Sequence, residues 1–163
     1  MSLTKDDLKN MKISCIEYQP EACSMRLSDS EVTRFKEKET LLAKKIGNIK
    51  IKYEIEHKLG PTKAYEELEE VCQISITKLK YAISCRKGNT ANRNFLYKFC
   101  VGLHMTLEEA NELFELENGA LSEECLADKI CMCALRDKDD IFTFINEFEE
   151  RTNLKIAMRE RKG

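Results

Sequence analysis

The sequence predicts an all-α protein, and two observations support that fold class. The 163 residues include only two prolines and six glycines, too few for the many tight turns of a β-sandwich or barrel. From Ser30 onward, apolar residues recur at three- and four-residue spacing, as on one face of a helix. No apolar run approaches the ~20 residues of a membrane span, so we expect no membrane contact. The polar start, without a secretory apolar region, predicts a cytoplasmic protein.

The first helical region is expected to follow a flexible N-terminal arm, residues 1–29. Ser30 is the predicted N-cap of a helix that continues to Ile46. The next stretch, residues 49–59, carries apolar residues at four-residue spacing and stops before a Gly-Pro pair. Together these stretches predict an extra N-terminal helical segment ahead of the main bundle.

Two short helices joined by a tight turn are predicted next. Thr62 is the expected N-cap of the first. The turn comprises residues 72–74, with Ile74 buried between the two helices. Ser75 is expected to cap the second helix, residues 76–84, which a polar loop around a glycine follows.

The remaining helices are located by their caps and apolar stripes. Thr106 and Glu109 have the spacing of a capping box. Ser122 and Asp139 are the expected starts of the last two helices, and a Phe-rich stripe covers residues 141–148. We therefore expect one helical domain over residues 30–150, with the helix-turn-helix at about residues 63–88 and a basic C-terminal tail at residues 151–163.

Eight cysteines are interpreted as structural thiols. No CxxC pair is present, and Cys131 and Cys133 would point to different faces of one helix. Nothing indicates the oxidising compartment in which disulfides persist, and free cysteine behaves as a small buried hydrophobic residue. We expect no metal and no cofactor. A thiol or metal sensor remains an alternative.

No enzymatic constellation is present, so no catalytic residue is predicted. The chain lacks a P-loop, a GxGxxG after a strand, an HExxH and a GxSxG. His57 and His104 are interpreted as an exposed helical residue and a packing residue. The sequence therefore predicts a binding protein without catalysis.

Charge is strongly segregated along the chain, although the formal net charge is only −2. Residues 72–105 carry six basic side chains and no acidic one, whereas residues 106–150 carry fourteen acidic and three basic side chains. A surface of one sign attracts polyanions whatever the total charge of the molecule. The basic stretch also coincides with the predicted two-helix motif.

That motif has the properties of a helix-turn-helix, in which the second helix enters the major groove. The outer face of the second helix must offer groups to base edges, and its ends must meet phosphates. The predicted base-reading residues are Ile76, Thr77, Lys78 and Tyr81. The predicted phosphate contacts are Thr62, Lys80, Arg86, Lys87, Asn92 and Arg93.

From about Ile49 to Phe148 the sequence resembles the lambda-repressor-like (Xre/Cro) helix-turn-helix regulators. Ile74-Ser75 matches the start of that family's recognition helix, and Cys85-Arg86-Lys87 matches the small basic element that closes it. Residues 103–110 match the phrase that opens the fifth helix. The resemblance implies a lambda-repressor-like helix-turn-helix bundle with an extra N-terminal helix and two extra C-terminal helices. Gln73, Cys85 and Ala91 depart from the family's glycines and proline.

The predicted function is a sequence-specific DNA-binding transcriptional regulator of bacterial or phage type, with double-stranded DNA as its partner. A homodimer is expected because one protomer reads half a site, and Phe144 on the 141–148 stripe is a candidate dimer contact. The same stripe more often closes a protomer's own core. The alternative is a protein-interaction module on the same fold, with an unidentified protein partner and no DNA binding.

Overall fold

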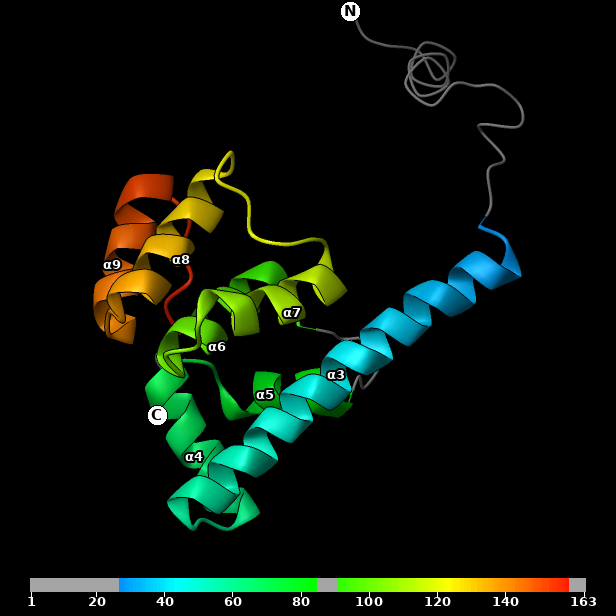
Figure 1. Cartoon of the computed structure of the whole chain (residues 1–163). Helices are drawn as coiled ribbons and strands as arrows, with labels where there is room; N and C mark the ends of the chain where they lie inside the picture. Colours follow the sequence, from blue (N-terminus) through cyan, green and yellow to red (C-terminus); the bar gives the residue numbers. More distant parts are fainter. Residues whose placement is uncertain (1–26, 85–90, 159–163) are drawn as a thin grey trace, which may run out of the picture. The chain divides into compact units, whose positions relative to one another are not determined.

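The computed structural model describes residues 27–84 and 91–158, and within these ranges it contains seven helices and no strand (Figure 1). The all-α prediction is therefore confirmed for the described part of the chain. Within the same ranges, no helix combines the length and apolar content that crossing a bilayer takes. The helices are α3 (Asp29–His57), α4 (Pro61–Cys72), α5 (Ile76–Ser84), α6 (Arg93–Gly102), α7 (Leu107–Glu117), α8 (Leu126–Asp137) and α9 (Ile141–Thr152).

The chain divides into two compact units, residues 1–36 and 37–163. In the first unit the described residues form the start of α3, which Ser28 caps. The Ser28 hydroxyl accepts from the backbone N–H of Glu31 at 3.2 Å, and the Glu31 carboxylate accepts from the Ser28 N–H at 3.3 Å. Ser30 is therefore not the N-cap, because the two reciprocal hydrogen bonds between Ser28 and Glu31 start the helix two residues earlier.

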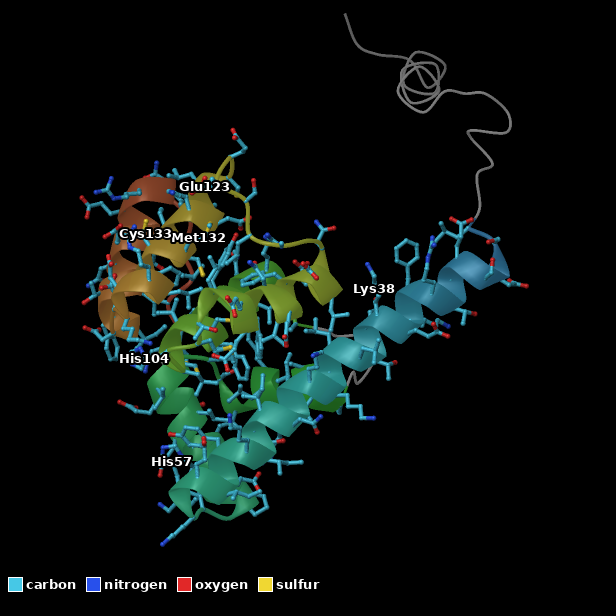
Figure 2. The ribbon with its side chains drawn as sticks, viewed as in Figure 1. Lys38, His57, His104, Glu123, Met132 and Cys133 are labelled. Atoms are coloured by element: carbon cyan, nitrogen blue, oxygen red, sulfur yellow. The ribbon has the colours of Figure 1, made fainter. Side chains whose placement is uncertain are left out.

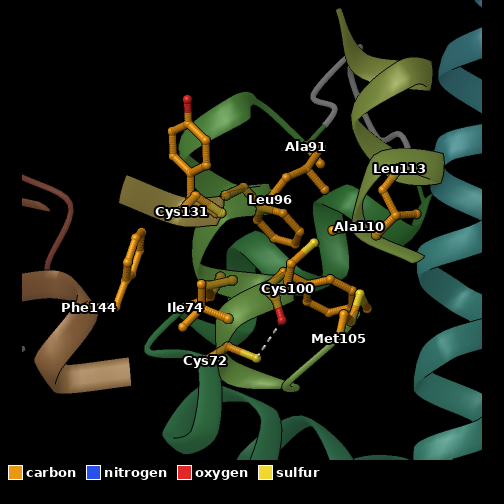
Figure 3. Packing of buried hydrophobic residues seen from close by; sticks show 14 of the residues in the cluster. Cys72, Ile74, Ala91, Leu96, Cys100, Met105, Ala110, Leu113, Cys131 and Phe144 are labelled. Carbon is orange, nitrogen blue, oxygen red and sulfur yellow. Dashed lines mark hydrogen bonds between the residues drawn. The ribbon is translucent and has the colours of Figure 1, made fainter. Parts of the chain in front are cut away.

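The hydrophobic core of the second unit is built around α6. Every α6 residue from Phe95 to Gly102 is buried. Helices α4, α7, α8 and α9 all pack against α6. Figure 3 shows this packing, with Leu96 and Cys100 of α6 among side chains contributed by the other helices. The largest fully buried side chains are Phe99, Phe114, Phe144 and Phe148.

Helix α9 uses its aromatic stripe inside this core. Phe144 is 1% exposed and Phe148 fully buried, and both rings contact each other with centroids 5.6 Å apart. Phe144 is therefore not available as a dimer contact. The reading in which the stripe closes the protomer's own core is confirmed, and only Phe142 of this stripe's aromatic residues lies outside, at 53% exposure.

Two predicted helix starts in the C-terminal half were wrong. Helix α8 begins at Leu126, and the Ser122 hydroxyl instead accepts from the N–H of Glu124 in the preceding turn. Helix α9 is capped by Asp140, whose carboxylate accepts from two backbone N–H groups, rather than by Asp139. After α9 the described tail folds back onto the domain, since Ile156 is buried and its N–H donates to the Glu149 carboxylate.

Candidate functional site

The turn between α4 and α5 has the predicted position and chemistry. Gln73 follows α4 in the left-handed region, with φ 55° and ψ 44°. Ile74 is 1% exposed, and the Ser75 hydroxyl accepts from the N–H of Lys78 at 3.2 Å. The buried turn residue and the Ser75 cap are thus confirmed. A carboxylate oxygen of Glu69 also accepts from the N–H of Ile76 at 2.8 Å, so both hydrogen bonds stabilise the start of α5.

Thr62 does not cap α4. The helix begins at Pro61, with Gly60 as N-cap and no side-chain cap hydrogen bond. Proline suits this first helical position because its fixed φ is helical and its missing N–H would be unpaired there. Thr62 is consequently the second residue of α4, and its side chain is exposed.

Helix α5 has one buried and one exposed side. Leu79 and Ala82 are buried at 0% and 4% exposure. Thr77, Lys78 and Lys80 are exposed, and Tyr81 and Ile76 are half-buried, so Ile76 points outward less than predicted. No acidic residue occurs within α5. The exposed side of α5 therefore presents a hydroxyl, two ammonium groups and part of a phenol ring.

Lys80 also belongs to a stack that joins three helices. The ammonium nitrogens of Lys50 in α3 and Lys80 in α5 lie 4.1 Å and 5.4 Å from the centroid of the Tyr65 ring in α4. Cations are attracted to the electron-rich ring face. The stack holds the Lys80 stem against α4 while its side chain remains exposed.

Arg93 is occupied inside the protein and is not presented as a phosphate contact. Its Nη2 and Nε donate to the two carboxylate oxygens of Asp128 at 2.7 and 3.0 Å. Its Nη1 donates to Glu117 at 3.1 Å and to the Gly119 carbonyl at 3.0 Å. A guanidinium with this many internal acceptors has no free fork for a phosphate. Arg93 therefore has no donor left for a phosphate, in contrast to its predicted role.

Asn92 is the N-cap of α6, since its side-chain oxygen accepts from the N–H of Phe95 at 2.8 Å. That cap fixes the start of α6 at Arg93. The oxygen is engaged, so only the amide N–H groups of Asn92 remain to meet a phosphate. Arg86 and Lys87 lie outside the described residues.

Lys98 is a functional candidate that the sequence reasoning missed. It is 6% exposed, and its ammonium donates to the carbonyl oxygen of Gln73 in the turn at 2.7 Å. Burial, together with the like charge of Lys78, lowers the pKa of Lys98 to about 8. The available signal was a lone lysine in the otherwise apolar run Phe95–Val101. Lys98 therefore ties α6 to the turn that precedes α5.

The basic surface is narrower than the sequence suggested. Of the six basic residues in residues 72–105, Arg93 and Lys98 are engaged internally and two lie outside the described residues. Lys78 and Lys80 remain exposed on α5. Among the described residues of this stretch, the positive charge exposed at the surface therefore comes from these two lysines.

The described cysteines include three buried thiols. Burial raises the pKa of Cys72 to about 12 and also raises the pKa of Cys100 and Cys131, which keeps these groups protonated and unreactive. Cys125 is exposed and Cys133 half-buried. In the part of the chain that the structure describes, no cluster of three or more metal-ligating side chains occurs. Cys15, Cys23 and Cys85 lie outside that part.

No family model, curated protein or solved structure matches this chain.

Proposed function

We propose that this chain is a sequence-specific DNA-binding regulator of the lambda-repressor-like helix-turn-helix type. The observation that carries the proposal is the exposed, carboxylate-free outer side of α5 directly after a tight, capped turn. A recognition helix must be held by its inner side while its outer side offers donors to base edges. The buried Leu79 and Ala82 hold the inner side of α5, and the exposed Thr77 and Lys78 are the donors on its outer side.

In this proposal the roles of the α5 residues follow from their chemistry. Lys78 donates to the acceptor edge of guanine, and Thr77 and Tyr81 supply hydroxyls that both donate and accept. The half-buried Ile76 leaves part of its side chain for a thymine methyl group. Lys80 contacts a phosphate together with Arg86 and Lys87, whereas Thr62 and the Asn92 amide add uncharged phosphate contacts.

The first test is selection of bound fragments from random duplex DNA, followed by titration of the selected site. Lys78→Ala is expected to cost about 1–3 kcal/mol at the selected site and to relax preference at one or two base pairs. Lys80→Ala is expected to weaken all sequences alike. With Lys80, Arg86 and Lys87 as the phosphate-neutralising cations, log affinity per protomer should fall with log salt at a slope of about −3.

The matched control is Lys129→Ala, which removes an exposed lysine on α8, far along the chain from the motif. It should bind the selected DNA as the wild type does. Equal affinity for the Lys78→Ala, Lys80→Ala and Lys129→Ala variants would refute DNA recognition by α5. Sedimentation of the DNA-bound and free protein measures whether two protomers occupy one site, as the half-site argument expects.

A protein-interaction module is the second candidate, and the internal use of Arg93 and Lys98 favours it. With these two cations engaged and the Glu69 carboxylate at the start of α5, the positive surface is small for a polyanion. The same outer side of α5 would then bind a protein. Selection that enriches no DNA fragment, with an intact fold by circular dichroism, would replace the first candidate with this one.

A further inference from the structure

A cavity of about 660 Å³ lies within the second unit, away from the outer side of α5. One wall is the C-terminal half of α3, and the other is formed by the end of α4, the corner after α6 and the first half of α7. Figure 2 marks one histidine on each wall, His57 on α3 and His104 at the corner after α6. The volume falls in the range of about 300–1,000 Å³ that small-molecule sites occupy.

The lining combines an apolar floor with a polar rim. Ile49, Tyr53, Val71, Leu103, Met105 and Leu113 supply the apolar part. An ion pair between Lys45 of α3 and Glu112 of α7, 3.5 Å from nitrogen to oxygen, connects the two walls.

The rim acids are mostly committed to protein partners. Glu109 accepts from the N–H of Thr106 at 2.9 Å in the α7 capping box, and this backbone hydrogen bond lowers its pKa. Glu112 is paired with Lys45. Glu56 is the remaining carboxylate of the lining. Two of the three rim acids thus have their charge matched within the protein.

The rim cation Lys52 has no such close partner. Among the described residues it makes no hydrogen bond or ion pair. Its positive charge acts on Glu109 from a longer distance and lowers the pKa of that carboxyl group. His57 and His104 flank the cavity with imidazole nitrogens, of which His57 Nδ1 already lies 3.0 Å from the Tyr53 carbonyl oxygen. Lys52 and Glu56 are thus the charged lining groups that make no hydrogen bond or ion pair among the described residues. Of the two, Lys52 is the one whose charge acts on the opposite wall, at Glu109, so its ammonium is the charged group that we place beside the apolar floor.

We propose that this cavity binds a small organic acid with an apolar body, whose anionic group pairs with Lys52 and whose body covers the floor formed by Ile49, Leu103 and Leu113. An apolar pocket with one convergent charge fixes both the class and the orientation of its ligand. The site is separate from the DNA-binding proposal, and its test uses no DNA.

The test is calorimetric titration of the full chain with 1-naphthoate, compared with two probes of the same ring system. These are 1-naphthylmethylammonium, which reverses the charge, and 1-naphthalenemethanol, which removes it. Saturable binding of 1-naphthoate is expected, at least about tenfold tighter than binding of either analogue, because a charge-assisted hydrogen bond is the difference. No saturable naphthoate binding, or equal binding of the three probes, would overturn the proposal.

Variants locate the site. Lys52→Met is expected to weaken naphthoate binding about tenfold, while Lys44→Met, which removes an exposed α3 lysine outside the lining, leaves it unchanged. Leu103→Trp should abolish binding by placing an indole ring on the part of the apolar floor that the body of the ligand would cover. Circular dichroism confirms that each variant is folded, and methyl NMR shifts of Ile49 and Leu113 on titration of the wild type provide an independent readout. Binding that survives Leu103→Trp, or wild-type methyl signals that do not move, would contradict the assignment.

Discussion

Arg93 and Asp128 are the centre of a buried polar network between α6 and α8. Asp128 is 2% exposed and accepts hydrogen bonds from the guanidinium, from the Tyr97 hydroxyl and from the N–H of Ser122. Burial raises the pKa of Asp128, but these hydrogen bonds outweigh it, so the net shift is downward. Its carboxylate therefore stabilises the fold above the ordinary Asp pKa, and the stabilisation is lost as the pH falls through the lower folded-state pKa.

Asp128→Asn should destabilise the protein by about 3–5 kcal/mol, because it leaves the Arg93 charge partly buried without its main partner. The control is Asp137→Asn, an exposed residue paired with the neighbouring Arg136, for which no measurable change in the free energy of unfolding is expected. Urea unfolding followed by circular dichroism measures both. Similar losses in the two variants would show that the network contributes no more than a surface pair.

Lys98 makes the free energy of unfolding depend on pH in the alkaline range, whereas Asp128 does so in the acidic range. Its pKa is about 8 in the folded protein, because of burial and Lys78, with Cys72 and Glu149 acting in the opposite direction. An unfolded lysine titrates near 10.4, so between these values the unfolded state binds more protons and stability rises with pH. The charged form of Lys98 thus costs stability at neutral pH.

Comparison with Lys98→Met isolates this contribution from the other titrating groups. The free energy of unfolding of the wild type, relative to Lys98→Met, should increase by roughly 1 kcal/mol per pH unit between pH 8.5 and 10. Urea unfolding of both proteins at several pH values provides the measurement, and Lys129→Met serves as an exposed control. A difference that is flat across this range would show that Lys98 has an ordinary pKa.

At the level of elements, α4 and α6 approach each other at Gly102. A Cβ atom there would lie 2.7 Å from the Cα of Cys72 and 2.7 Å from the carbonyl oxygen of Val71. Both contacts are backbone atoms, so a side chain could be accommodated only by moving α4 away from α6. The position of α4, and with it the turn before α5, depends on this glycine.

Gly102→Ala should therefore destabilise the protein by about 1–3 kcal/mol, despite the better helix propensity of alanine. The control is Gly60→Ala, because a Cβ atom at Gly60 meets nothing within 4 Å and its φ is −79°. Thermal unfolding of the two variants tests the prediction. If Gly102→Ala unfolds at the wild-type temperature, the close packing of α4 on α6 is not present in solution.

The outcome at each cap shows what the sequence could predict. Ser75 and the Thr106–Glu109 box were found because each signal lies within four residues and has no competitor nearby. The predictions of Ser30 and Thr62 as N-caps were wrong, because α3 is capped by Ser28 and α4 begins at the Gly60-Pro61 pair, both earlier in the chain. Local signals of this kind identify a helix more reliably than its first residue.

The candidate site was predictable only where it depended on local pattern. The exposed side of α5 follows from helical periodicity, and Thr77, Lys78 and Lys80 are exposed as expected. The engagement of Arg93 by Asp128 joins residues 35 positions apart, and periodicity gives no information on such pairs. The Lys98 contact with the turn, 25 positions away, was hidden for the same reason.

Across the whole molecule, the segregation of charge is partly an internal match. The acid-free stretch, residues 72–105, sends Arg93 to Glu117 and Asp128 of the acidic stretch that follows. Charge counts along a sequence therefore overestimate the surface field when basic and acidic stretches pack together. Among the described residues of this stretch, the basic side chains that remain exposed are Lys78 and Lys80 of α5. For this reason we expect only a modest decrease of DNA affinity with increasing salt concentration.

The hydrophobic core places the N-terminal limit of the stable domain within α3. Its first buried core residues are Leu42, Ala43 and Ile46, whereas Leu27 and Phe35 are 55% and 48% exposed. The division into units at Lys36 and Glu37 falls between these two groups. The described residues 27–36 should therefore contribute little to the stability of residues 37–163.

Deletion of residues 1–36 is expected to change the free energy of unfolding by less than about 1 kcal/mol, the cost of exposing a new helix end. Deletion of residues 1–47 removes Leu42 and Ile46 as well and should cost several kcal/mol, because buried aliphatic side chains contribute about 2–5 kcal/mol each. Urea unfolding of the two truncated proteins and the full chain separates the cases. A large loss already in the shorter deletion would mean that the first unit is part of the same cooperative domain.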